Sequence, residues 1–246
     1  MKIAVMGAGG FVGSRLVEKL RRTENEITTH DRSTGVDLLT GEGVPEALAD
    51  AGAVVNAIDA PSFDEAAVAF FRTTTETLLH AAAQAGVRNV VLLSIVGIDD
   101  AADVPYYEAK LLQERLVEAG PVPYSIVRAT QFMEFIESIL SWTSDGDAVR
   151  LPTTRIQPVA VDDVVDTLAE VATGPALNGV INVAGPTAYP LDALGRLTLQ
   201  ARPDGRHVVV DETAGLFGQV PRDAVVAPPG ARLGSTSYPQ WLKHGA

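Results

Sequence analysis

The chain has 246 residues, carries a formal net charge of −12 and contains no cysteine. An acidic chain repels phosphates in bulk, so we expect no nucleic-acid partner, although backbone N–H groups can still bind a phosphate locally. The absence of cysteine excludes disulfides and thiolate metal sites, and the scattered histidines lack metal-type spacing, so we predict no metal site. Without a secretory signal or a run of about 18 apolar residues, we expect no membrane partner and a cytoplasmic location.

Apolar segments alternate with helical patterns along the first half of the chain. The pattern predicts strands at 2–6, 26–31, 53–58 and 89–94 and a strand that ends near Arg128, with helices at 11–22, 44–50, 63–85 and 106–118 between them. Because these strands are mostly apolar, we predict an α/β fold, a Rossmann-type doubly wound parallel sheet.

After Thr130 the pattern is looser, with predicted helices at 131–142 and after a cap at Asp162. We therefore predict a dinucleotide-binding core at 1–130. Residues 131–246 are predicted to form a small C-terminal substrate-binding lobe that contributes to the core, in a single folding unit.

A glycine-rich stretch, GAGGFVG, joins the first predicted strand to the first predicted helix. Gly7, Gly10 and Gly13 follow the spacing G-x-x-G-x-x-G. In such a loop the first glycine allows a tight turn, the second admits a pyrophosphate, and the third lets the helix pack on the strand. The stretch predicts a nucleotide site that also includes Phe11 and Val12; the alternative is a glycine turn without a ligand.

The end of the second predicted strand carries residues that choose between NAD and NADP. Asp31 lies where a carboxylate accepts hydrogen bonds from the adenine ribose, which favours NAD. Arg32 follows directly, and a guanidinium there holds a 2′-phosphate, which favours NADP. The choice is open at this point. Further cofactor-binding candidates are Asp37 and Leu38 in the next loop, where a turn residue is a nearly equal interpretation of Asp37, and Ala57 and Ile58 at the end of the third predicted strand.

A candidate catalytic set follows the fourth predicted strand. Ser94 ends that strand, and Tyr106 and Lys110 are four residues apart, so they share one face of a helix. A nearby ammonium lowers the pKa of a phenol toward neutrality, which suits proton transfer at a carbonyl or alcohol. The same pair is also common on ordinary helix surfaces, and the adjacent Tyr107 is an alternative to Tyr106.

The segments GAGGFVG, LLSIVGID, YYEAK and YSIVRATQF, in this order, resemble the short-chain dehydrogenase/reductase superfamily, in particular its atypical NmrA-like branch. The resemblance implies that Tyr106 is the acid/base, that Lys110 supports it and binds the cofactor ribose, and that Ser94 polarises the substrate oxygen. It also implies that Gln131, Phe132 and Phe135 line the nicotinamide and substrate region.

We therefore expect an NAD(P)-dependent oxidoreductase that acts on a carbonyl or alcohol of a small organic molecule. Two alternatives are a redox sensor that binds NAD(P)H without turnover, as some NmrA-like proteins do, and a non-redox isomerase or dehydratase on the same fold. The helix predicted at 63–85 leaves open a homodimer, because the equivalent helix in this superfamily often packs in a dimer interface.

Overall fold

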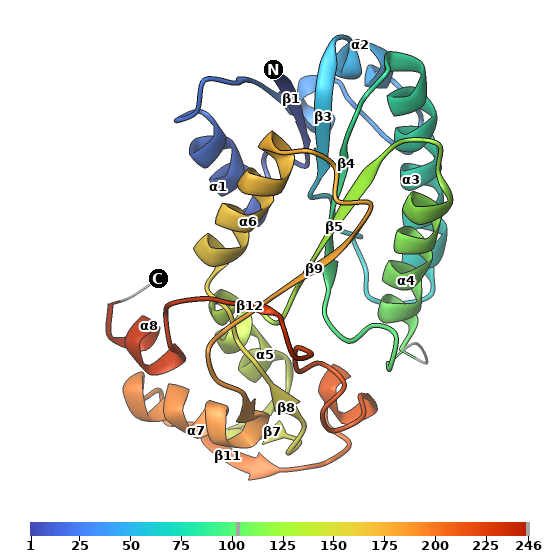
Figure 1. Cartoon of the computed structure of the whole chain (residues 1–246). Helices are drawn as coiled ribbons and strands as arrows, with labels where there is room; N and C mark the ends of the chain where they lie inside the picture. Colours follow the sequence, from blue (N-terminus) through green and yellow to red (C-terminus); the bar gives the residue numbers. More distant parts are fainter. Residues whose placement is uncertain (102–103, 245–246) are drawn as a thin grey trace. The chain divides into compact units, whose positions relative to one another are not determined.

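The computed structural model describes residues 1–101 and 104–244 of the chain (Figure 1). The strands are β1 (Lys2–Met6), β2 (Glu26–His30), β3 (Ala51–Asn56), β4 (Val90–Ile95), β5 (Tyr124–Ala129), β6 (Ser144–Asp145), β7 (Ala148–Leu151), β8 (Arg155–Ile156), β9 (Gly179–Ala184), β10 (Tyr189–Pro190), β11 (His207–Val210) and β12 (Arg232–Leu233). The helices are α1 (Phe11–Leu20), α2 (Val44–Leu48), α3 (Ala66–Ala85), α4 (Pro105–Ala119), α5 (Ile136–Trp142), α6 (Val161–Thr173), α7 (Leu191–Ala201) and α8 (Tyr238–His244), with 3-10 turns η1 (Arg32–Thr34), η2 (Met133–Phe135) and η3 (Leu216–Gln219).

The central sheet has the strand order β12-β9-β5-β4-β3-β1-β2. β1 pairs in parallel with β2 on one side and with β3 on the other, and β3 pairs in parallel with β4. The chain thus moves outward from β1 to β2 and then returns to the opposite side of β1. This reversal marks the position where open α/β sheets bind ligands, beyond the carboxyl ends of β1 and β3. The predicted Rossmann-type parallel sheet is confirmed.

Helices cover both faces of this sheet. Figure 1 shows α1 and α6 on one side and α3 and α4 on the other. Every residue of β3 is buried, which explains why its sequence is apolar without alternation. Leu48, Val54, Leu78 and Ile126 belong to the core between the sheet and its helices, and each is at most 1% exposed.

Several predicted helix ends differ from the structure. The helix predicted at 63–85 begins only at Ala66, because the carboxylate of Asp64 accepts hydrogen bonds from Ser62 Oγ and the Ala66 N–H and so forms a turn before the helix. The helix predicted to follow a cap at Asp162 begins at Val161. Asp162 therefore lies inside the first turn, where its charge suits the helix dipole.

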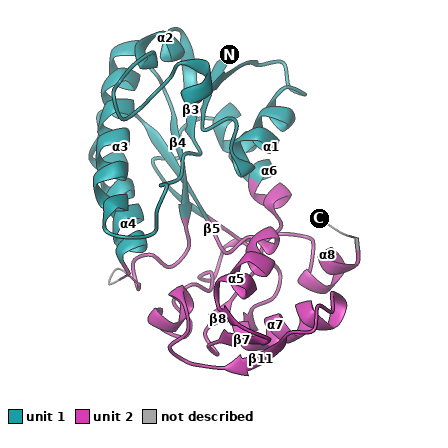
Figure 2. Ribbon diagram, turned by 180° about the vertical axis from the view of Figure 1, so that it is seen from behind, with its two compact units in different colours: residues 1–94, 105–128, 165–181 teal, residues 95–104, 129–164, 182–246 magenta. Residues whose placement is uncertain are grey.

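The chain divides into two compact units, coloured separately in Figure 2. Unit 1 comprises Met1–Ser94, Pro105–Arg128 and Val165–Ile181, and unit 2 comprises Ile95–Val104, Ala129–Val164 and Asn182–Ala246. Within unit 2, β11, β7 and β6 form a small sheet and β10 pairs with β8. The predicted division into residues 1–130 and 131–246 stays a prediction about folding. None of the helices in the described residues has the length and apolar character needed to cross a membrane.

Candidate functional site

The glycine loop after β1 is tightly constrained. Gly7 has φ +77°, a left-handed conformation that glycine adopts without strain. A Cβ at Gly13 would lie only 2.0 Å from the carbonyl oxygen of Gly7, so α1 packs against the end of β1 as closely as its backbone allows. A Cβ at Gly7 would in turn lie 3.0 Å from Ala57. The loop therefore occupies the position between β1 and β3 where the strand order reverses.

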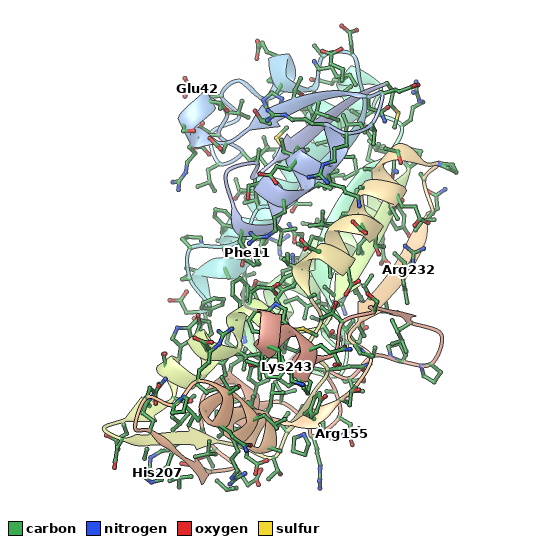
Figure 3. The ribbon with its side chains drawn as sticks, turned by 90° about the vertical axis from the view of Figure 1, so that its left-hand side faces the viewer. Phe11, Glu42, Arg155, His207, Arg232 and Lys243 are labelled. Atoms are coloured by element: carbon green, nitrogen blue, oxygen red, sulfur yellow. The ribbon has the colours of Figure 1, made fainter. Side chains whose placement is uncertain are left out.

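The N-terminus of α1 follows this loop directly; Figure 3 labels Phe11, the first residue of the helix. Gly10 is the N-cap and provides no side chain to cap the helix. The first backbone N–H groups of a helix lack intrahelical partners and carry partial positive charge, which is what a pyrophosphate requires. The glycines and the uncapped helix end therefore fit a dinucleotide.

Asp31 follows β2 and caps the turn η1. Its carboxylate accepts hydrogen bonds from the backbone N–H and the hydroxyl of Ser33, and the hydroxyl bond is the main cause that lowers the pKa of Asp31. A Cβ at Gly9 would lie 2.8 Å from Asp31 Oδ2, so this carboxylate adjoins the glycine loop. The side chain of Arg32 is exposed. The structure thus places Asp31 beside the glycine loop, and it leaves the choice between NAD and NADP open.

The two candidates in the following loop have structural roles. The carboxylate of Asp37 accepts a hydrogen bond from the Leu39 N–H at 2.8 Å, as expected of a turn residue. Leu38 is buried in the core of unit 1. Contact of either residue with a bound cofactor stays a prediction.

Tyr106 lies near the N-terminus of α4, and its hydroxyl donates a hydrogen bond of 2.6 Å to Asp59 Oδ1, in the loop after β3. The ring is buried, with its centroid 4.9 Å from that of Phe63 and 6.2 Å from that of Phe71. Asp59 is two residues from Ala57, which adjoins Gly7. The loop after β3 therefore connects Tyr106 to the glycine loop.

The predicted effect of Lys110 on Tyr106 is wrong. Burial raises the pKa of Tyr106 well above its ordinary value, and the negative charge and hydrogen bond of Asp59 raise it further. The sequence pattern suggested a tyrosinate stabilised by an ammonium. The structure instead shows a buried phenol whose hydroxyl donates a hydrogen bond to a carboxylate.

Lys110 is buried beneath α3. Its ammonium donates hydrogen bonds to the carbonyl oxygen of Leu93 at 2.9 Å and to Gln113 Oε1 at 2.6 Å, and it lies 4.8 Å from the centre of the Phe71 ring. Burial lowers the pKa of Lys110 to about 8, although Asp59 and Glu114 act in the opposite direction. An ammonium has three N–H donors, and two of those of Lys110 are used in these bonds.

Ser94 is 2% exposed, and its Oγ has no hydrogen-bond partner among the described residues. It directly follows Leu93, whose carbonyl binds Lys110. The structure therefore brings the end of β4 to Lys110. A buried hydroxyl without a partner is unusual, and a ligand that hydrogen-bonds to it would remove that deficit.

The predicted substrate residues belong to unit 2. The rings of Phe132 and Phe135 pack edge to face with centroids 5.7 Å apart. Gln131 Oε1 accepts a weak bond from the Gln157 N–H at 3.4 Å, and Gln131 Nε2 is buried without a partner in the part of the chain that the structure describes. These three residues cluster within unit 2, and their contact with substrate stays a prediction.

Two polar residues of the candidate site were not predicted. Gln113 lies three residues after Lys110 on the same helix, and residues at this spacing are neighbours on a helix surface, so the sequence contained a signal for this contact. Asp59 directly follows the buried segment AVVNAI, and a carboxylate after a buried parallel strand lies at the edge where ligands bind. Its hydrogen bond to Tyr106 joins residues 47 positions apart, and no pattern in the sequence around either residue predicts it.

A family described as NAD(P)H-binding matches residues 7–175, which include the glycine loop, α3 and α4. The chain belongs to this family. The match confirms the dinucleotide-binding prediction, since the family binds a nicotinamide dinucleotide, NAD or NADP. A protein of Bacillus subtilis (strain 168) described as an uncharacterized sugar epimerase, YhfK, is 25% identical over 151 residues, or 52% of this chain and 71% of that protein.

Several solved structures share the fold of this chain. MoeE5, in complex with UDP-glucose and NAD, has a TM-score of 0.71 and 23% identity over 89% of this chain and 87% of that chain. TunA, an NAD-dependent NDP-hexosamine 5,6-dehydratase, has a TM-score of 0.74 and 15% identity over 98% of this chain and 95% of that chain. A nucleoside-diphosphate-sugar epimerase from Staphylococcus aureus has a TM-score of 0.73 and 15% identity over 99% of this chain and 100% of that chain.

Proposed function

We propose that this protein is an NAD(P)-dependent oxidoreductase that reduces a carbonyl or oxidises an alcohol on a small organic molecule. The observation that carries the proposal is the position of Tyr106, a neutral phenol buried beside the loop that packs against the glycine turn. A nicotinamide dinucleotide held by the glycine loop and the N-terminus of α1 would supply hydride exchange with the substrate carbon. Tyr106 exchanges the proton with the substrate oxygen.

The other residues of the site have supporting roles in this proposal. Lys110 uses its third N–H on the cofactor ribose, and Ser94 Oγ donates to the substrate oxygen. Gln131, with its buried amide nitrogen, and the rings of Phe132 and Phe135 contact the substrate. The inward position of Tyr106 favours an enzyme over a sensor, because a sensor needs no buried proton donor.

A second candidate is an epimerase or dehydratase that returns its cofactor unchanged. It is favoured by the descriptions of the relatives, which include sugar epimerases and an NDP-hexosamine dehydratase. Such enzymes would use the same Tyr106 on a sugar nucleotide. The two candidates differ in whether reduced cofactor accumulates.

Calorimetry with NADH and NADPH identifies the cofactor. Absorbance at 340 nm then follows NAD(P)H with a panel of aldehydes and ketones, and NAD(P)⁺ with UDP-glucose and UDP-glucuronic acid. NMR of the sugar nucleotides detects conversion without net redox change. A consistent change at 340 nm supports the oxidoreductase, whereas a new sugar with constant absorbance supports the second candidate. Cofactor binding without either change supports a sensor.

Tyr106→Phe tests the residue assignment. We expect turnover to fall by roughly 10²- to 10⁴-fold, the usual contribution of a general acid or base, with cofactor affinity nearly unchanged. Tyr107→Phe is the matched control, because this neighbouring ring is also buried. If Tyr107→Phe abolishes turnover and Tyr106→Phe does not, the proton donor is Tyr107.

A further inference from the structure

The hydrogen bond between Tyr106 and Asp59 joins a buried group to an exposed one. Tyr106 is 7% exposed, whereas Asp59 is classed among the exposed residues of the chain. Asp59 Oδ1 also accepts a bond from the N–H of Ala60 at 2.8 Å, which fixes the carboxylate toward the phenol. A continuous path for a proton therefore leads from the phenol to solvent.

Among the groups that surround Tyr106 and Asp59, only the Asp59 carboxylate is placed to accept a proton from the phenol. The rings of Phe63 and Phe71 pack against Tyr106, and both are uncharged. Tyr107, on the same helix, has its own pKa raised by burial. The ammonium of Lys110 interacts electrostatically with Asp59, but its hydrogen bonds go to Leu93 and Gln113. Below about pH 8 Lys110 is an ammonium without a lone pair, and its hydrogen bonds do not reach Tyr106, so it does not receive the proton.

We propose that Asp59 is the proton acceptor that couples Tyr106 to solvent. The role of Asp59 in turnover rests on the proposed function. Asp59 acts through Tyr106 and has no assigned contact with substrate, so it is a positioning residue in the reaction. No feature of the family match or of the relatives' descriptions assigns this role.

The step balances in the direction of alcohol oxidation. The substrate carbon loses a hydride to the oxidised nicotinamide cofactor, and the substrate hydroxyl gives its proton to Tyr106 Oη. Tyr106 in turn gives its own proton to the Asp59 carboxylate, which then releases it to water. Tyr106 remains neutral before and after the step. This explains how a phenol whose pKa is raised can still serve as a base. Carbonyl reduction runs the same path backwards, from a protonated Asp59.

The geometry predicts an effect on Tyr106 that is measurable without cofactor or substrate. We would label tyrosine with ¹³C at Cζ, assign the Tyr106 resonance by its loss in Tyr106→Phe, and titrate the free protein with alkali. In the wild type, Tyr106 should remain un-ionised through pH 10, near which an exposed tyrosine titrates.

Asp59→Asn removes the charge and keeps an oxygen that can accept the Tyr106 hydrogen bond. We expect this variant to shift the Tyr106 Cζ resonance at pH 7, because the phenol then donates its hydrogen bond to a neutral amide oxygen instead of a carboxylate. Asp64→Asn is the matched control, since this exposed carboxylate of the same loop bonds Ser62 and Ala66. An identical Tyr106 Cζ resonance in the wild type and Asp59→Asn would overturn the inference.

Turnover gives the second readout. With an alcohol substrate found by the assays above, Asp59→Asn should lower kcat by at least tenfold and abolish its rise with pH, with little change in KM. Formate added to Asp59→Ala should restore part of the rate, because a small carboxylate can occupy the vacated position. An unchanged pH profile in Asp59→Asn would also overturn the role. If no substrate turns over, the proposed function fails, and the Tyr106 Cζ resonance still decides whether Asp59 is coupled to Tyr106.

Discussion

The ammonium of Lys110 donates a hydrogen bond of 2.6 Å to the amide oxygen of Gln113, three residues along the same helix. This bond and the one to Leu93 direct the lysine into the interior of unit 1. Burial of an ammonium disfavours its charged form, which accounts for a pKa of about 8. The consequence is a stability that depends on pH.

Lys110→Met should remove a rise in stability between pH 8 and 10. In the folded wild type, Lys110 loses its proton from about pH 8, whereas the unfolded chain keeps it to about pH 10.4. The unfolded state then binds more protons, so the free energy of unfolding increases with pH across this interval. Urea denaturation at pH 7.5, 8.5 and 9.5 measures it. Lys19→Met, which replaces a partly exposed lysine, should keep the wild-type slope. A slope that persists in Lys110→Met would contradict the assignment.

Glu114 and Arg128 form a buried ion pair between α4 and β5. The side chain of Glu114 is 2% exposed, and its carboxylate binds both Nε and Nη2 of Arg128. Glu114→Ala leaves the guanidinium without this partner, so we expect a loss of about 3–5 kcal/mol in the free energy of unfolding. Glu76→Ala is the control, because its pair with Arg72 is half exposed, and it should cost less than about 1 kcal/mol. Equal losses in urea denaturation would show that burial of the pair is unimportant.

Gly13→Ala should damage both the fold and the cofactor site. The new methyl group would begin 2.0 Å from the carbonyl oxygen of Gly7, and backbone cannot move aside as a flexible side chain does. We expect a loss of about 1–3 kcal/mol in stability and weaker binding of NADH or NADPH by calorimetry. Gly179→Ala is the control, since its nearest neighbour would lie at 3.8 Å. Wild-type affinity in Gly13→Ala would mean that the close approach of α1 to β1 does not shape the site.

Arg32→Ala tests which dinucleotide the chain prefers. If this exposed guanidinium pairs with a 2′-phosphate, the variant should bind NADPH about tenfold or more weakly and bind NADH nearly as before. Arg22→Ala, at an exposed position after α1, should change neither affinity. Calorimetry with both cofactors gives the answer. Equal losses for NADH and NADPH would show that Arg32 does not contact the phosphate.

The sequence alone determined the parallel sheet and the location of the nucleotide loop. Both depend on local signals: apolar strands without alternation predict a sheet buried on two faces, and the spacing of Gly7, Gly10 and Gly13 reports a turn that admits no side chains. Helix ends were less certain, because a single side chain, such as that of Asp64, decides where the backbone leaves the helix.

Only the tertiary structure decided which group holds Tyr106. The helical period brought Lys110 onto the same face, and this led to the wrong sign for the pKa of Tyr106. The strand order instead places the loop after β3 beside α4, so that Asp59 reaches the phenol across 47 residues. A pKa depends on burial and on nearby charges in space, and neither follows from spacing along the chain.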